Sequence, residues 1–194
     1  MNRLLNLHAS RARRTGQRGS ILIETLMAMV VLTIGLGGLL ALLTTAMATN
    51  NRSGEDTTSL MVSEHVMEQI SAQPADSITP LSIKDCAGTA WSISTADAFK
   101  GGGNSNSYGG NGANLLSDGT VDWTQTYASM PAGYRMQYTS CGAGGRQTTF
   151  DVRWDVIRMS SYSRMIVVSA RPDGSKMGGV RYVTPFSLRT IGGM

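Results

Sequence analysis

The sequence predicts an α+β protein in which a long N-terminal α-helix packs against a small antiparallel β-sheet. Three observations lead to this fold class. A charge-free apolar stretch covers residues 25–51, a helical pattern follows over residues 55–72, and apolar and polar residues alternate in segments between residues 134 and 188. At 194 residues, the chain accommodates one modest domain and an apolar anchor.

Positive charge is concentrated at the N-terminus. The net charge is +4, and five of the 17 basic residues lie within residues 1–19, which contain no acidic residue. The other 12 basic residues are balanced by 13 acidic ones, so the rest of the chain has no basic excess for nucleic-acid binding. We interpret residues 1–19 as a basic leader and expect no nucleic-acid partner.

The apolar stretch is long enough to cross a bilayer. A span needs about 20 apolar residues, whereas the apolar region of a secretory signal peptide has only about 7–15. Because the basic leader precedes the stretch, the positive-inside bias predicts a cytoplasmic N-terminus and an exported domain. We therefore assign residues 20–51 to the transmembrane half of the long helix, with the lipid bilayer around it.

The exported half of the helix is expected over residues 52–74. Gly54 predicts a kink or local melting, because glycine costs roughly 1 kcal/mol relative to alanine inside a helix, and Pro74 is expected to stop the helix. Acidic residues fall mainly outside an apolar stripe that would pack on the sheet. That stripe comprises Leu60, Met61, Val66, Met67 and Ile70.

The residues around Glu24 carry the most specific motif. The basic leader ends at Gly19, Ser20 follows, and Glu24 opens the charge-free stretch. This pattern resembles the class III signal of the type IV pilin superfamily, and residues 34–53 and 63–74 are similar to V-type minor pilins, the pilus modification or assembly proteins. The resemblance implies a pilin-like fold, cleavage between Gly19 and Ser20 by prepilin peptidase, and N-methylation of Ser20.

The resemblance also implies a role for Glu24. An ionised carboxylate inside a bilayer costs several kcal/mol and is usually paired. Cleavage creates an amine at Ser20 that can neutralise Glu24 of a neighbouring subunit. The implied protein is a minor pilin precursor, a non-enzymatic structural subunit that is assembled into a type IV pilus or primes one.

The implied location is the bacterial inner membrane, crossed once, with a cytoplasmic N-terminus and a periplasmic head; after assembly it is a pilus or pseudopilus. The implied partners are other pilins or minor pilins, prepilin peptidase and the inner-membrane assembly platform. Two alternatives remain open: a minor pseudopilin of a type II secretion system, and a pilus-displayed adhesin or DNA-uptake subunit. Phenylalanine is common in the family where Ser20 stands, so cleavage and methylation should be less efficient or merely tolerated. Many major pilins have proline where Ala41 stands and a loop closed by a cysteine near the C-terminus, which this sequence lacks, so a major subunit is disfavoured.

The exported head is expected over residues 75–194 and is rich in β-structure. Residues 148–157, in which apolar and polar residues alternate from Phe150 to Val156, predict a strand with one apolar and one polar face, paired in a hairpin with residues 164–171. A turn signal at residues 172–174 precedes a third candidate over residues 180–188. Weaker candidates are residues 90–94 and 134–138.

Residues 99–119 are rich in glycine, asparagine and serine and are interpreted as a mobile surface loop. The segment lacks the G-K-[ST] ending of a phosphate-binding loop. The three tryptophans are expected in the core rather than at a ligand site: Trp91, Trp123 and Trp154.

Two cysteines, Cys86 and Cys141, lie outside any metal-binding spacing. In an oxidising compartment they could form one disulfide, and the alternative is two unrelated buried thiols.

No catalytic arrangement is recognisable in the sequence, so we expect no enzyme, no cofactor and no metal. His65, with Glu64 and Glu68 on the same helix, could be read as a metal site. Such a group is more often a solvated helix face, which is our interpretation.

Overall fold

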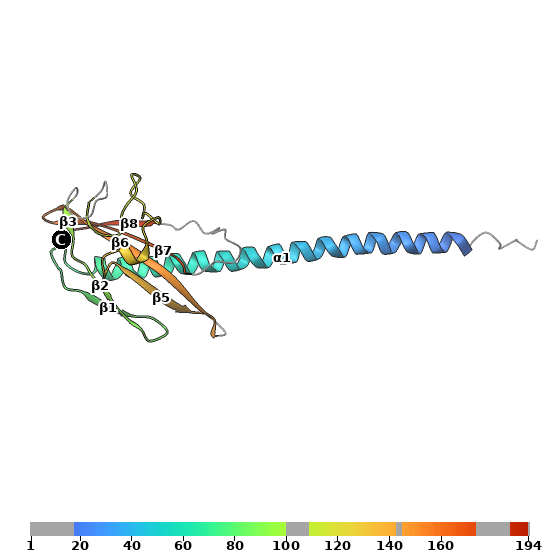
Figure 1. Ribbon diagram of the computed structural model, residues 1–194, viewed down its shortest axis with the longest axis horizontal. Helices are drawn as coiled ribbons and strands as arrows, with labels where there is room; N and C mark the ends of the chain where they lie inside the picture. The colour runs from blue at the N-terminus through green and yellow to red at the C-terminus, as the bar shows by residue number, and fades with distance from the viewer. Residues whose placement is uncertain (1–17, 100–108, 143–144, 174–186, 194) are drawn as a thin grey trace, which may run out of the picture. The chain divides into compact units, whose positions relative to one another are not determined.

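The computed structural model describes residues 18–99, 109–142, 145–173 and 187–193 (Figure 1). Most of the expected leader, and residues 100–108 of the glycine-rich segment, lie outside these ranges. The chain divides into two compact units, residues 1–50 and 51–194.

A single helix, α1 (Arg18–Ser71), contains 54 residues and runs without interruption through Gly54. The local melting predicted there is therefore wrong. The hydroxyl groups of Thr57 and Thr58 donate to the carbonyl groups of Ser53 and Gly54 at 2.8 Å, which adds polar contacts around the glycine. The helix ends three residues before Pro74, slightly earlier than the expected boundary.

The described residues of the head form one six-stranded sheet and a separate two-stranded hairpin. In the large sheet, β7 pairs with one edge of β6 and β8 continues beyond β7, while three shorter strands follow one another along the opposite edge of β6 (Figure 1). The hairpin comprises β1 (Leu81–Lys84) and β2 (Ala90–Ile93). The sheet comprises β3 (Ala98–Phe99), β4 (Asn111–Gly112), β5 (Arg135–Cys141), β6 (Gln147–Ser160), β7 (Ser163–Pro172) and β8 (Ser187–Gly193).

The α+β class is confirmed, but the sheet is larger than the expected three or four strands. It is also mixed rather than purely antiparallel, because β3 runs parallel to β6. The short β3 returns to the edge of β6 after the β1–β2 hairpin, a connection that the local alternation of residues does not reveal.

The strongest strand predictions are confirmed. The hairpin over residues 148–157 and 164–171 corresponds to β6 and β7, and the two weaker candidates correspond to β2 and β5. The candidate over residues 180–188 lies mostly outside the described residues, with only its last two residues in β8. Strand β1 was not predicted, because its alternation covers only four residues, and the remainder of β8 was not predicted, because it shows no regular alternation.

One face of the sheet packs against the second half of α1. The helix contributes Val62, Val66 and Ile70, and the sheet contributes residues that include the fully buried Trp154. The predicted stripe is partly wrong, since Leu60 and Met61 are 37 % and 62 % exposed.

Buried serines replace those two residues at the helix–sheet contact. Ser59 and Ser63 are both buried, and the Ser63 hydroxyl donates to the Ser59 carbonyl at 2.9 Å. The Ser63 hydroxyl can be buried at reduced cost because it bonds within the helix, whereas the buried Ser59 hydroxyl has no hydrogen-bond partner among the described residues. Serine therefore marks the buried face of the helix here.

The opposite face of the sheet is also covered, so the predicted polar face of β6 is not exposed. Asp151, Arg153 and Asp155 are all buried. Residues 109–130, which include part of the glycine-rich segment, lie on this face and form a second apolar cluster with β6 and β7. Its buried members are Ala113, Leu115, Val121, Met130, Ile157, Met165 and Val167.

The interpretation of residues 99–119 as a surface loop is wrong for its described second half. Gly110, Gly112, Ala113 and Leu115 are buried against the sheet. The reason is that the small residues allow the backbone to lie directly on β6, with Gly112 opposite Asp155 in the ladder.

Candidate functional site

The predicted processing pair and Glu24 all lie in the first turns of α1. The helix begins at Arg18, so Gly19 and Ser20 are its second and third residues. Glu24 follows Ser20 by four residues, which places the two positions on the same side of the helix, one turn apart. Cleavage, methylation and the pairing of Glu24 are not tested by this geometry and stay predictions.

The first half of α1 presents an apolar surface on all sides. Every residue from 21 to 54 is exposed within this chain, and Glu24 is the one charged residue between positions 20 and 51. Soluble monomers rarely expose apolar patches larger than a few hundred Å². The described residues contain one helix that is long and apolar enough to cross a membrane.

The polar side chains in this helix are largely satisfied by the helix itself. Hydroxyl groups of Thr25, Thr33, Thr44, Thr45 and Thr49 donate to carbonyl groups three or four residues earlier, at 2.7–2.9 Å. Because a bonded hydroxyl is less costly to remove from water than a free one, these threonines are compatible with an apolar environment.

The structure pairs Cys86 with Cys141 in a disulfide, so the alternative of two unrelated thiols is wrong. The two Cα atoms are 5.9 Å apart and the residues are 55 positions apart in sequence. The bridge ties the loop between β1 and β2 to the end of β5. The backbone N–H of Cys86 also donates to the carbonyl of Thr139 at 3.2 Å.

The carboxylate of Asp85 organises the loop beside the bridge. It accepts hydrogen bonds from the Thr89 N–H at 2.8 Å, the Trp91 indole at 3.2 Å and the Thr139 N–H at 3.4 Å. Burial opposes ionisation of this group, but the hydrogen bonds outweigh it and lower the pKa of Asp85. Trp91 is half-buried: it packs against the edge of the main core and anchors the loop through its indole N–H.

Replacing both Cys86 and Cys141 with serine is expected to lower the free energy of unfolding of the head by about 4 kcal/mol, because the bridge constrains the unfolded chain. Urea denaturation of the full chain in detergent measures this loss. Reductant should reproduce it in the unsubstituted protein and have no effect on the double variant. Peptide mapping without reductant should link the two cysteines, and two alkylatable thiols in exported protein would exclude the bridge.

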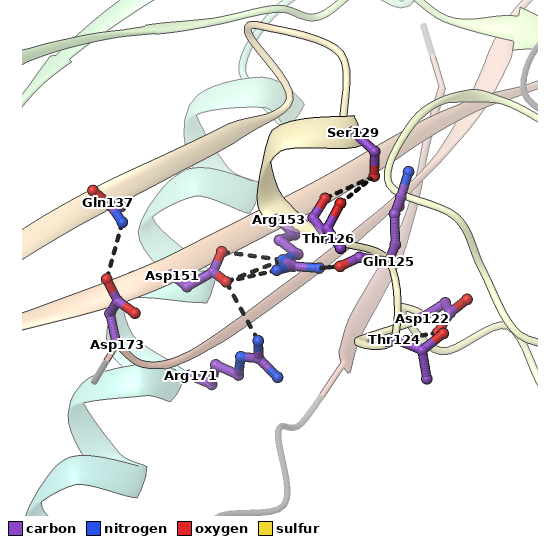
Figure 2. Close-up of polar contacts among 10 residues, drawn as sticks. All are labelled: Asp122, Thr124, Gln125, Thr126, Ser129, Gln137, Asp151, Arg153, Arg171 and Asp173. Carbon is purple, nitrogen blue, oxygen red and sulfur yellow. Dashed lines mark hydrogen bonds and ion pairs between the residues drawn. The ribbon is translucent and has the colours of Figure 1, made fainter. Parts of the chain in front are cut away.

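A polar network joins the covered face of the sheet to residues 123–125 (Figure 2). The Arg153 guanidinium donates to the Asp151 carboxylate, with its shortest contact at 2.7 Å, and to the Gln125 carbonyl at 2.6 Å. Asp151 also lies 3.7 Å from the Arg171 guanidinium. Both guanidinium groups lie over the ring of Trp123, at 4.5 Å and 4.1 Å from its centroid.

This network was missed in the sequence, although alternating opposite charges on β6 were its available signal. Asp151 and Arg153 are two positions apart and therefore lie on the same face of the strand. Trp123 is only half-buried, so the prediction that it belongs to the core is incomplete. The network attaches residues 109–130 to the sheet, and no catalytic arrangement is recognisable within it.

Within the described ranges, no group of three or more histidine, cysteine or acidic side chains could hold a metal ion. His65 and its neighbours Glu64 and Glu68 are exposed on α1. Comparison with known protein families, curated proteins and solved structures finds no match to this chain. The structure by itself defines an α+β protein with one N-terminal helix suited to crossing a membrane.

Proposed function

We propose that the chain is the precursor of a pilin-like filament subunit, of the minor pilin type, that is cut after Gly19. The observation that carries this proposal is the position of Glu24. It is the single charged residue between positions 20 and 51, in a part of α1 whose residues from 21 on are exposed among the described residues, and it lies one turn from the new N-terminus that cleavage would create.

Cleavage would change the electrostatics of Glu24 in two ways. Removal of residues 1–19 makes Ser20 the first residue of the helix and gives it a positive amine. The unsatisfied N–H groups at a helix N-terminus also favour a nearby negative charge. In an assembly of parallel helices, the amine of one subunit can reach Glu24 of the next, so a carboxylate that is costly alone becomes a contact between subunits.

The apolar surface of α1 requires lipid before assembly and other helices after it. An added Cβ at Gly35, Gly37 or Gly38 would meet no atom within 4 Å in this chain, so no contact inside the chain requires glycine there. Small residues allow two helices to approach closely in a membrane or a helical core. This openness supports packing against a neighbouring pilin helix.

The proposed location follows from the same features. The protein would cross the inner membrane once, with its basic leader in the cytoplasm, where prepilin peptidase acts, and its disulfide-bonded head in the periplasm. Disulfides persist in oxidising compartments, so the Cys86–Cys141 bridge agrees with an exported head.

Mass spectrometry of the protein from cells with active prepilin peptidase is expected to find a mature chain that begins at N-methylated Ser20. Replacement of Gly19 with valine should retain the leader, because a bulky residue at the cut would block the peptidase. Gly16→Val is the matched control, since it alters a leader glycine away from the cut. A mature population that still begins at Met1 would contradict the processing proposal.

The nearest competing function, a minor pseudopilin of a type II secretion system, shares the same processing. Deletion of the gene separates the two functions. Loss of surface pili with normal protein secretion supports the pilus assignment, and the reverse result supports the pseudopilus.

A further inference from the structure

Asp155 is a fully buried titratable group in the described head. Its side chain is 0 % exposed, and neither carboxyl oxygen has a hydrogen-bond partner of normal geometry. It lies on the face of β6 that residues 109–130 cover. The proposed function assigns no role to this group.

A short glycine-rich stretch lies directly over this carboxyl group. A Cβ atom added to Gly110 would be 2.7 Å from both Asp155 oxygens, and the φ angle of +99° at Gly110 favours glycine. Gly112 is paired opposite Asp155, and the Ala113 N–H donates to the Trp154 carbonyl at 2.8 Å. We call residues 109–113 the cover segment.

The other residues described around Asp155 are either apolar or already have a hydrogen-bond or ion-pair partner. Val167 of β7 lies opposite it in the ladder, and Ile157 follows it on the same face. Three charged or titratable groups lie nearby. Arg153 of β6 donates to Asp151 and to the Gln125 carbonyl. Tyr134 donates to the Ala96 carbonyl, and Asp97 is paired with Arg158.

We propose that Asp155 is a pH-sensitive latch: its carboxyl group is protonated while the cover segment lies over it, and loss of the proton releases the segment. A buried carboxylate without a partner is strongly disfavoured relative to the neutral acid. Opening the cover segment would admit water to the carboxylate. The head thereby acquires a conformational response to the pH of its compartment.

The direction of the response follows from proton linkage. Burial raises the pKa of Asp155 from 3.8 to about 8 in the closed state, and the adjacent Val156 N–H offsets part of the rise. The closed state therefore binds more protons than a hydrated open state between these two values. The opening equilibrium constant should rise about tenfold per pH unit over this interval and level off above it.

Hydrogen exchange of the full chain in detergent tests the latch. After correction for intrinsic exchange rates, protection of the peptide over residues 109–116 should fall about 100-fold from pH 5 to pH 7. Asp155→Asn removes the titrating group and should change protection less than about threefold over the same range. Asp118→Asn is the matched control, because it alters an exposed carboxyl group in the same region and should keep the full slope. Residues 165–168 of β7 serve as the internal reference.

Three results would overturn the proposal. The first is an Asp155→Asn variant that keeps the pH slope of the unsubstituted protein. The second is an unsubstituted protein whose protection over residues 109–116 stays constant between pH 5 and pH 7, and this measurement decides the matter even if the variant does not fold. A slope that appears equally in residues 165–168 would also overturn it, since it would report global unfolding.

Discussion

Replacing Glu24 with alanine is expected to leave cleavage after Gly19 intact and to reduce incorporation into filaments at least about tenfold. The expected size follows from the loss of a charge contact in an apolar environment, where unpaired charges cost several kcal/mol. The ratio of subunit in sheared filaments to subunit in membranes, measured by immunoblot, gives the effect. Mass spectrometry of the membrane fraction checks that the N-terminus is still Ser20.

Two matched variants separate charge pairing from general damage to α1. Glu24→Gln keeps the size of the side chain and should be nearly as defective as alanine. Glu64→Ala removes an exposed carboxylate from the other half of the same helix and should assemble normally. Normal incorporation of Glu24→Ala would refute the pairing role while leaving the processing proposal intact.

Replacing Arg164 with methionine is expected to lower the free energy of unfolding of the head by about 3 kcal/mol, a loss typical of breaking a buried hydrogen-bond network. Arg164 is buried in β7, and its guanidinium donates to the carbonyl groups of Ile70 and, at 2.8 Å, Gln73. The Ile70 carbonyl lies in the last turn of α1 and the Gln73 carbonyl two residues beyond it, and cationic donors are favourable at this end of a helix. Urea denaturation of the full chain in detergent measures the loss.

Two controls accompany this variant: the same substitution at an exposed arginine, and a more conservative substitution at Arg164 itself. Arg146→Met alters an exposed arginine and should shift stability by no more than about 0.5 kcal/mol. Arg164→Lys should be intermediate, because lysine keeps the charge but lacks the forked donor geometry. An unchanged unfolding midpoint for Arg164→Met would show that the helix end does not depend on this residue.

The alternation of apolar and polar residues predicted the strands in which it occurs. The alternation from Phe150 to Val156 identified β6 and its hairpin with β7 correctly. The same alternation did not reveal that its polar side would be buried, because burial depends on residues 109–130, whose glycine and asparagine content is typical of exposed loops. An arginine occupies the same place in the alternation whether its side chain stacks on a tryptophan from elsewhere in the sequence or faces water.

Residue type also misidentified the buried face of α1. Hydrophobicity selected Leu60 and Met61, whereas Ser59 and Ser63 lie against the sheet, where small side chains permit a close approach. For the candidate site, the two cysteines could be named but not paired by their spacing alone. Gly19, Ser20 and Glu24 were identified by motif, and their roles depend on a peptidase and on neighbouring subunits that one chain does not contain.

The Cys86–Cys141 bridge has a mechanical consequence for a protein that is pulled by its ends. The segment between the cysteines, which are 55 positions apart and about 190 Å apart if that segment were fully extended, cannot lengthen under tension while the bridge is intact. That segment contains β2, β3, β4, the cover segment and Trp123. Stretching would therefore extend the chain outside the bridge, and the residues between the two cysteines would bear no tension.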